Sequence, residues 1–346
     1  MAEEQKPNKP IITRNEFIIV SSFFGFTLIL LLFTFYIPNY YKQPEPVEID
    51  ITHGSTLSQV IDTLYSRKII PNKMNMKIIA YLYGAEKKIK AGRYNIPNGL
   101  NYIKLVGLLI NGSPSTQILV TIPEGIWQSE VAQILQNNLH IDSTKVMELS
   151  KSKSFLNYLN LDVSNLEGYL LPESYYFYSN VSAEEILGKL KDEMDKFFTP
   201  KITARMKELK MTKNQILTLA SIIDGESNLV SEFKTIAGVY YNRLKKGMPL
   251  QADPTVQYLI RDKHKNRIFK KDLLIDSKFN TYKYYGLPPG PINNPGKDAI
   301  MAALYPEKNN FLYFVATGNG GHAFSKTNSE HELNVSRYRQ WRRNQN

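Results

Sequence analysis

The chain has 346 residues, 42% of them hydrophobic and 22% charged, which allows more than one domain and excludes a disordered or fibrous protein. Lysine and arginine (43) outnumber aspartate and glutamate (32), and the net charge of +11 suits work beside an anionic surface. The chain has no cysteine and five histidines, so disulfides, thiolate metal sites and cysteine nucleophiles are excluded, and we expect no metal or other cofactor.

The first predicted element is a transmembrane helix over residues 17–37, which carry no charge and are rich in Phe, Leu and Ile. At 1.5 Å per residue such a helix spans about 30 Å, the thickness of the hydrocarbon layer. A buried core helix or a cleaved signal peptide would read similarly, but the run ends in tyrosines rather than in small residues. We therefore expect a tail at 1–16, the anchor at 17–37 and a linker at 38–46.

Flanking charges predict how this anchor is oriented. Lys6, Lys9 and Arg14 precede it, whereas only Lys42 follows closely, so the positive-inside rule places residues 1–16 in the cytoplasm. The protein is then a single-pass protein of the cytoplasmic membrane, with the lipid bilayer as one partner and the rest of the chain outside the cytoplasm. That location disfavours nucleic acid as a partner.

Two strand-helix units follow between residues 47 and 140. Residues 47–51 alternate apolar and polar side chains, and a helix with Leu57, Val60, Ile61 and Leu64 on one face follows a cap at Ser55 or Thr56. A second strand is expected at 92–97. The pattern recurs after residues 117–122, because aligning Gly54 with Gly125 superimposes the apolar positions of both helices.

Helical patterns dominate from residue 141 onward. We expect helices at 143–157, 183–198, 212–225 and 231–246, an irregular wall rich in Pro, Gly, Asn and Tyr at 248–296, and a short buried strand at 312–316. The chain ends in a basic, solvated helix around Arg337 and Arg343. The predicted fold class is α+β, with a mainly helical larger domain at 141–346.

The helix at 212–225 leads to the strongest catalytic candidate, Glu226. Thr212 and Gln215 have the spacing of a capping box, and the helix that they open is unusually apolar. Desolvation against this apolar face, together with the negative end of the helix dipole, should raise the pKa of Glu226 toward the value needed by a general acid. Gly225 beside it should leave room for a bulky substrate. The alternative is a surface glutamate at a helix end.

Several motifs around Glu226 resemble those of one enzyme family. They are LEGYLLPESY at 166–175, LASIIDGES at 219–227, VYYNRL at 239–244, GMPLQADPTVQY at 247–258, NTY at 280–282, GLPPGPI at 286–292, NPG at 294–296, YFV at 313–315 and GHAF at 321–324. In this order they resemble the endolytic murein transglycosylases, the MltG or YceG-like family. The resemblance covers nearly all of the chain beyond the anchor.

The resemblance implies roles for individual residues. Glu226 matches the family's catalytic glutamate, and Asp224 matches a preceding acidic position with a shorter acid, for which a supporting role stays open. The residues that match other motifs and are expected to wall the glycan cleft are Gln251, Asp253, Tyr258, Asn280, His322 and Glu167. Turn formation or core support is the alternative for each of them. The family also has a LysM-like segment, which fits residues 47–140.

The implied activity is that of a lyase, an endolytic lytic transglycosylase. It cuts the β-1,4 bond between N-acetylmuramic acid and N-acetylglucosamine inside peptidoglycan strands, leaves 1,6-anhydro ends, and would end the growth of new strands beside the synthases (penicillin-binding proteins). Glu226 alone serves as acid and then base, because the substrate supplies its own nucleophile. A hydrolase that pairs Glu226 with Asp253 or Glu232 stays open.

Two other classes of function were weighed. A membrane-anchored protein could bind peptidoglycan without cleaving it, and Glu226→Gln would then change no activity. A pyridoxal-phosphate lyase is disfavoured, because no glycine-rich strand-to-helix loop with a suitable lysine is found.

Overall fold

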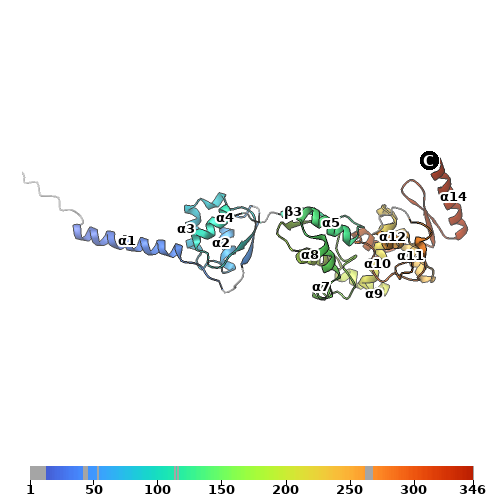
Figure 1. The fold of residues 1–346 in the computed structure, drawn as a ribbon, viewed down its shortest axis with the longest axis horizontal. Coiled ribbons are helices and arrows are strands. Elements are labelled where there is room, and N and C mark those ends of the chain that lie inside the picture. The colour runs from blue at the N-terminus through green and yellow to red at the C-terminus, as the bar shows by residue number, and fades with distance from the viewer. Residues whose placement is uncertain are drawn as a thin grey trace, which may run out of the picture. The chain divides into compact units, whose positions relative to one another are not determined.

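The protein is described here from a computed structural model, which describes residues 13–41, 46–52, 54–112, 114, 117–261 and 268–345. The chain divides into two compact units, Met1–Gln117 and Ile118–Asn346, which are described separately (Figure 1). Both mix helices with short strands, and the strands described pair two by two as β1–β2, β3–β4 and β5–β6.

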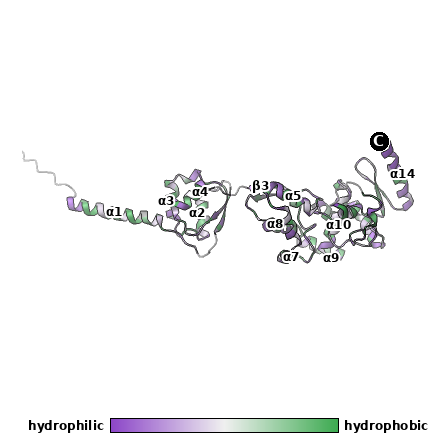
Figure 2. Cartoon of the chain, in the orientation of Figure 1, coloured by the Kyte–Doolittle hydropathy of each residue, from purple (hydrophilic) through white to green (hydrophobic). Residues whose placement is uncertain are grey.

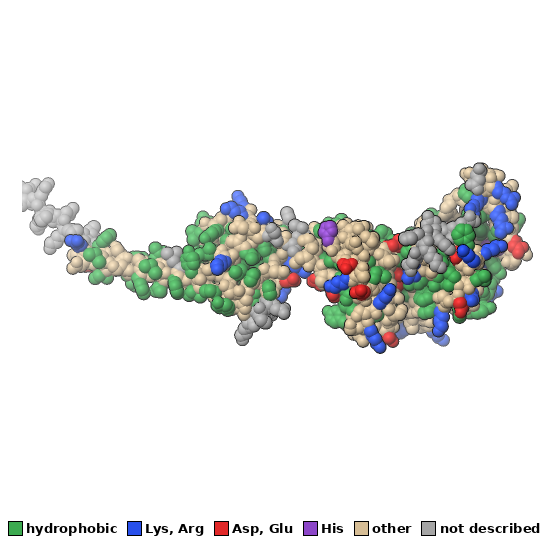
Figure 3. All heavy atoms as spheres, in the orientation of Figure 1, with side chains coloured by type: hydrophobic (Ala, Val, Ile, Leu, Met, Phe, Trp, Pro, Cys, Tyr) green, Lys and Arg blue, Asp and Glu red, His purple; other side chains and the backbone are tan. Residues whose placement is uncertain are grey.

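The first unit begins with helix α1, Arg14–Tyr36, which is capped by Thr13 and Glu16. Its mean hydropathy reaches 2.4 over a window with no buried residue. Figure 2 colours much of this helix as hydrophobic, and Figure 3 shows its hydrophobic side chains on the surface. The helix is long and apolar enough to cross a membrane, and it contains nearly all of the predicted anchor. Its last turn joins the core, since Phe35 is 3% exposed and packs edge-on against Tyr102.

The rest of the first unit is a small layer of helices on an antiparallel pair. Strand β1, Val47–Ile51, pairs with β2, Gly92–Ile96, as expected from the alternation of their side chains. The helices are α2 at Leu57–Ser66, α3 at Lys73–Leu82 and α4 at Tyr102–Asn111, with a 3-10 turn at Ala85–Lys87. Thr56 caps α2, which settles the choice between Ser55 and Thr56.

The second strand-helix pattern belongs to the second unit. Strand β3, Gln117–Thr121, pairs with β4, Ser174–Tyr178, and helix α5, Gln128–Leu139, packs into the same core as the helices that follow. The division between the two compact units falls after Gln117, because the apolar face of α5 is buried against later elements.

The other elements of the second unit follow in chain order. They are α6 at Ser143–Lys151, α7 at Lys153–Tyr158, α8 at Ala183–Phe197, α9 at Pro200–Leu209, α10 at Lys213–Glu226, α11 at Val230–Lys245, α12 at Asp253–Ile260, a 3-10 turn at Asp272–Leu274, α13 at Lys297–Leu304, β5 at Tyr313–Ala316, β6 at His322–Ser325 and α14 at Asn328–Gln345.

Four features of these elements differ from what the sequence led us to expect. The helix expected at 143–157 is two helices, because Ser152 ends α6 and caps α7 with its own hydroxyl. Helix α9 was not expected, and α12 lies inside the stretch expected to be irregular. Strand β5 is half-buried rather than buried, since three of its residues line a cavity. The last helix, α14, has no buried residue and carries the arginines on a solvated surface, as predicted (Figure 3).

Helix α10 is the structural centre of the second unit. The Thr212–Gln215 capping box opens it as predicted, and every residue from Ile216 to Ile223 is buried. It contacts α11, α12 and α13, so the helix is surrounded by other elements, and Figure 2 shows its hydrophobic residues inside the unit. Packing on all sides holds the helix in place, and Glu226 is its last residue.

Candidate active site

A cavity of about 380 Å³ lies at the carboxyl end of α10. Its walls come from α10, α11, the start of α12, the β5–β6 hairpin and α14. The lining residues are Glu226, Tyr240, Arg243, Leu250, Gln251, Asp253, Tyr282, Phe314, Val315, Ala316, His322 and His331. Four of the residues that the sequence nominated, Glu226, Gln251, Asp253 and His322, are thus brought together by segments far apart in the chain.

Glu226 is held by a buried tyrosine of the next helix. The hydroxyl of Tyr240, a residue only 1% exposed, donates to Oε1 of Glu226 at 2.5 Å. Burial raises the pKa of Glu226 to about 7 and Asp253 adds to the rise, while the Tyr240 hydrogen bond and Arg243 act in the opposite direction. Burial also keeps the pKa of Tyr240 well above its usual value, so Tyr240 remains a donor. A carboxyl in this state can give a proton and take one near neutral pH.

Gly225 serves packing rather than substrate access. A Cβ atom at Gly225 would lie 2.8 Å from Cβ and 3.1 Å from Cγ of Pro254. The glycine therefore lets the first turn of α12 approach the end of α10. The expected room for a substrate lies instead on the side of Glu226 that faces the cavity.

Gln251 and Asp253 form one wall. Asp253 begins α12 and accepts a hydrogen bond from the hydroxyl of Tyr282 at 2.5 Å, which together with burial raises the pKa of that tyrosine. Gln251 has φ of +50°, its backbone N–H donates to Thr281, and its side chain accepts from Arg243 at 3.3 Å. A non-glycine residue in this region is strained by about 1 kcal/mol or more, so its surroundings hold it there.

His322 also lines the cavity, at the start of β6. Its ring packs edge-on against Phe314, with the ring centroids 5.3 Å apart. Its Nδ1 lies 2.7 Å from Oε2 of Glu232, and its backbone N–H donates to Oε1 of the same carboxylate at 2.8 Å.

Tyr258 and Asn280 lie outside this set of lining residues. Tyr258 is 6% exposed. The centroid of its ring lies 5.2 Å from that of Phe279 and 4.0 Å from Cζ of the Arg261 guanidinium. Asn280 is fully buried, and its amide donates to the carbonyls of Leu273 and Ile275. Both side chains support the segment behind the cavity wall.

Glu167 also lies outside the lining of the Glu226 cavity, where its own segment meets those of Gln128 and Asn294. Its Oε1 accepts from the backbone of Gln128 at 2.8 Å and from Asn294 at 3.4 Å, and Asn294 in turn accepts from the N–H groups of Gly168 and Leu170. Glu167 is 2% exposed, and this burial raises its pKa to about 7. The residue ties the loop after α7 to the segment before α13.

Asp224 points away from the cavity as well. Its Oδ2 would lie 3.0 Å from a Cβ atom at Gly125, and burial, with the nearby charge of Glu124, raises its pKa to about 7. Of the two acidic residues at the end of α10, Glu226 therefore lines the cavity and Asp224 lies outside its lining.

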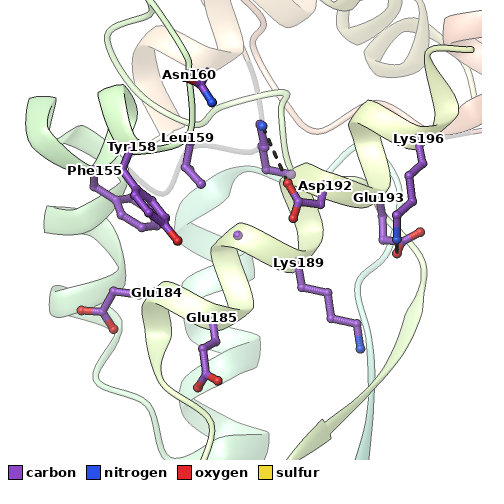
Figure 4. A pocket seen from close by; sticks show the side chains of 12 residues that line it. Phe155, Tyr158, Leu159, Asn160, Glu184, Glu185, Lys189, Asp192, Glu193 and Lys196 are labelled. Atoms are coloured by element: carbon purple, nitrogen blue, oxygen red, sulfur yellow. Dashed lines mark hydrogen bonds and ion pairs between the residues drawn. The ribbon is translucent and has the colours of Figure 1, made fainter.

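A larger hollow, of about 760 Å³, lies between α7 and α8 and has a different character (Figure 4). Some of its charged side chains already have partners: Lys196 pairs with Glu193 of the same lining at 2.7 Å, and Lys189 donates to the carbonyl of Tyr176. The pKa of Glu184 is lowered by a backbone hydrogen bond at the start of α8. A carboxyl of this kind is a poor general acid, so the Glu226 cavity is the candidate active site.

Sequence reasoning missed Tyr240 and Tyr282 as members of the site, and it named Glu232 as a possible second carboxylate rather than as the partner of His322. Tyr240 stands in the VYYNRL motif, but only the packing of α11 beside α10 shows that its hydroxyl reaches Glu226. Among the described residues, no group of three or more His, Asp or Glu side chains is arranged to hold a metal ion.

Comparison with known proteins agrees with the motifs. The model of the YceG-like family matches residues 49–337. The endolytic murein transglycosylase of Bacillus subtilis (strain 168) is 34% identical over 306 residues, which cover 84% of each chain. That of Streptococcus pneumoniae serotype 2 (strain D39 / NCTC 7466) is 30% identical over 322 residues, 84% of this chain and 58% of the relative.

The fold agrees with a solved structure of the same kind. The crystal structure of a yceG-like protein from Listeria monocytogenes superimposes with a TM-score of 0.59 at 33% identity, over 84% of this chain and 99% of that one. The resemblance found in the motifs is thereby confirmed over the two compact units. With a family model spanning both units and relatives matching most of its length, the chain belongs to the YceG-like family.

Proposed function

We propose that this protein is an endolytic lytic transglycosylase that cleaves the β-1,4 bond between N-acetylmuramic acid and N-acetylglucosamine within peptidoglycan strands. The observation that carries the proposal is Glu226, a carboxyl with a pKa of about 7 on the wall of a cavity. The relatives named endolytic murein transglycosylase support the substrate and the reaction.

The two oxygens of Glu226 have different tasks in this reaction. Tyr240 donates to Oε1, so the acidic proton belongs on Oε2. From there it passes to the glycosidic oxygen as the bond to C1 of the muramyl residue breaks. The resulting carboxylate then accepts the proton of the muramyl C6 hydroxyl while that oxygen bonds to C1. The product ends in a 1,6-anhydro sugar, no water is consumed, and Glu226 is protonated again.

The alternative of a two-carboxylate hydrolase depends on Asp253. Both oxygens of Glu232 are engaged by His322, so Glu232 is a poor base for water. Asp253 is the other carboxylate lining the cavity, and it accepts a hydrogen bond from Tyr282. A hydrolase would need Asp253 to activate water and would leave reducing ends instead of anhydro ends.

We assign the nominated binding residues to two groups within this proposal. Gln251, Asp253 and His322 contact the glycan, because they line the cavity beside Glu226. Tyr258, Asn280 and Glu167 hold the segments that carry this wall, in keeping with their burial.

The remaining parts of the proposal concern place and partners. Residues 17–37 anchor the protein in the cytoplasmic membrane with 1–16 inside, and both compact parts beyond the anchor lie outside. The first unit after the anchor serves as the LysM-like module that holds peptidoglycan. The enzyme acts beside the peptidoglycan synthases and ends the growth of nascent strands. The apolar length of α1 and the charges around it support this arrangement.

The test is mass spectrometry of purified glycan strands digested with the full-length protein in detergent. We expect internal fragments with 1,6-anhydro ends, and a loss of cleavage of about 100-fold or more in Glu226→Gln, with folding and glycan binding kept. Glu148→Gln, at an exposed position in α6, is the matched control. Reducing-end products would make the protein a hydrolase, and undiminished cleavage by Glu226→Gln would remove the assignment.

A further inference from the structure

The carboxylate of Glu232 contacts His322 at two points, the backbone N–H and the imidazole ring. Glu232, in the first turn of α11, accepts the backbone N–H of His322 with Oε1 at 2.8 Å and faces Nδ1 with Oε2 at 2.7 Å. The side chains are 13% exposed for His322 and 17% for Glu232. The start of a helix also favours a negative charge at this position. A carboxylate has no proton to donate, so Nδ1 of His322 must carry the hydrogen.

Neighbouring residues hold the carboxylate of Glu232 and the ring of His322 in place. A Cβ atom at Gly321 would lie 2.9 Å from Oε1 of Glu232, so a larger residue there would push the carboxylate away. The hydroxyl of Ser227 donates to Oε2 at 3.3 Å, and Phe314 packs against the imidazole ring. Glycine before His322 is therefore needed for the close approach of the carboxylate.

The second ring nitrogen has no such partner. Within the described residues, Nε2 of His322 makes no hydrogen bond, and the residue lines the same cavity as Glu226. When the ring is neutral and its hydrogen is on Nδ1, Nε2 is an acceptor. The cavity thus presents an acceptor, Nε2 of His322, together with the proton donor Glu226.

We propose that Glu232 is a positioning residue that fixes the imidazole of His322 with its hydrogen on Nδ1, so that Nε2 accepts a hydrogen bond from a hydroxyl or acetamido N–H of the bound glycan. The inference rests on the proposed function for the identity of the ligand, because sugar rings offer these donors. Which ring nitrogen carries the hydrogen does not depend on the proposed function, because the contact with Glu232 determines it.

The state of the ring can be measured without substrate. Full-length protein labelled with ¹⁵N in its histidines, in detergent micelles, should show an Nδ1–H ring for His322, assigned by comparison with His322→Gln. In Glu232→Gln the amide oxygen can still accept the backbone N–H, while the NH₂ group faces Nδ1. We expect the hydrogen to move to Nε2, since Nδ1 must now accept. An unchanged ring in Glu232→Gln would overturn the proposal.

Kinetics on purified glycan strands separate positioning from mere support of the hairpin. In the natural protein, Glu232→Gln should lower kcat/KM about tenfold, which is the effect of one lost hydrogen bond. In a protein that already carries His322→Gln, adding Glu232→Gln should not change kcat/KM. The matched control is Glu185→Gln, which alters a capping carboxylate of α8 and should leave kcat/KM unchanged. An equal loss in both backgrounds would contradict a role through His322. Failure of Glu226→Gln to stop cleavage would instead contradict the proposed function, and leaves the ring measurement valid.

Discussion

The carboxyl group of Glu226 is the residue on which the chemistry depends. Its pKa is the balance between burial, which disfavours the anion, and the hydroxyl of Tyr240, which favours it. Since the reaction begins with the protonated acid, activity should fall as the pH rises through this pKa. Tyr240 thus sets the alkaline side of the pH profile.

Replacing Tyr240 with Phe tests this balance. The variant removes the hydrogen bond that lowers the pKa of Glu226, so the alkaline limb of the kcat/KM profile should move to higher pH. Tyr241→Phe is the control, because the Tyr241 hydroxyl donates to the carbonyl of Ala303 instead. A limb that stays in place, or moves to lower pH, would show that Tyr240 does not control this carboxyl.

Glu167 allows a test of stability at the residue scale. Its pKa is raised to about 7 in the folded chain, so folding favours the protonated form, and stability is lost as the pH rises from about 4.5 through 7. Glu167→Gln removes this titration. The unfolding free energy of the variant minus that of the natural protein should therefore be about 1 to 3 kcal/mol larger at pH 8 than at pH 4.

Urea unfolding of the two proteins at both pH values measures this gain. Glu148→Gln, at an exposed site, is the control for the substitution itself, because it retains Glu167 and with it the pH dependence of the natural protein. If the difference between Glu167→Gln and the natural protein is the same at pH 4 and pH 8, the burial of Glu167 does not govern its ionisation.

At the scale of elements, the contact between α10 and α12 places the site. Glu226 ends one helix and Asp253 begins the other, and the two ends meet where Gly225 touches Pro254. The approach requires that the residue before Glu226 have no side chain.

Gly225→Ala should therefore damage both stability and activity. The added methyl meets the rigid ring of Pro254 at 2.8 Å, and we expect a loss of about 1 to 3 kcal/mol of unfolding free energy together with reduced cleavage. Gly188→Ala in α8 is the matched control, since nothing lies within 4 Å of its added Cβ. That control should gain up to about 1 kcal/mol from helix propensity. Equal effects of the two substitutions would refute the packing role of Gly225.

At the scale of the molecule, the anchor is part of the first unit's core. Phe35 and Tyr41 are buried, and the Tyr41 hydroxyl donates to the carbonyl of Ile96 at 2.6 Å. The end of α1 is therefore tied to the folded unit, and the place where a variant without the apolar part of α1 begins should matter.

Two soluble variants, residues 34–346 and residues 47–346, test this connection by scanning calorimetry. The shorter one lacks Phe35 and Tyr41, and we expect its first unit to lose about 3 kcal/mol or more and to melt at a lower temperature. The second unit should melt at the same temperature in both variants, because its core contains neither residue. Identical melting of the first unit in both variants would contradict this view.

The sequence by itself determined the local features, because helix caps, apolar periodicity and uncharged length act between near neighbours in the chain. The capping box at Thr212, the end of α10 beside Glu226 and the long apolar helix α1 are of this kind. The same local reasoning merged α6 with α7, because a break at one serine leaves the apolar period nearly intact.

Only the tertiary structure decided which side chains meet. Gln251, Asp253 and His322 share a cavity with Glu226, whereas Tyr258, Asn280 and Glu167, which belong to equally recognisable motifs, are buried as supports. Tyr240 and Glu232 became part of the site only through the packing of α11 against α10 and β6. Hydrogen bonds and burial depend on distances between segments that are remote in the chain, and these distances are fixed by how the helices pack.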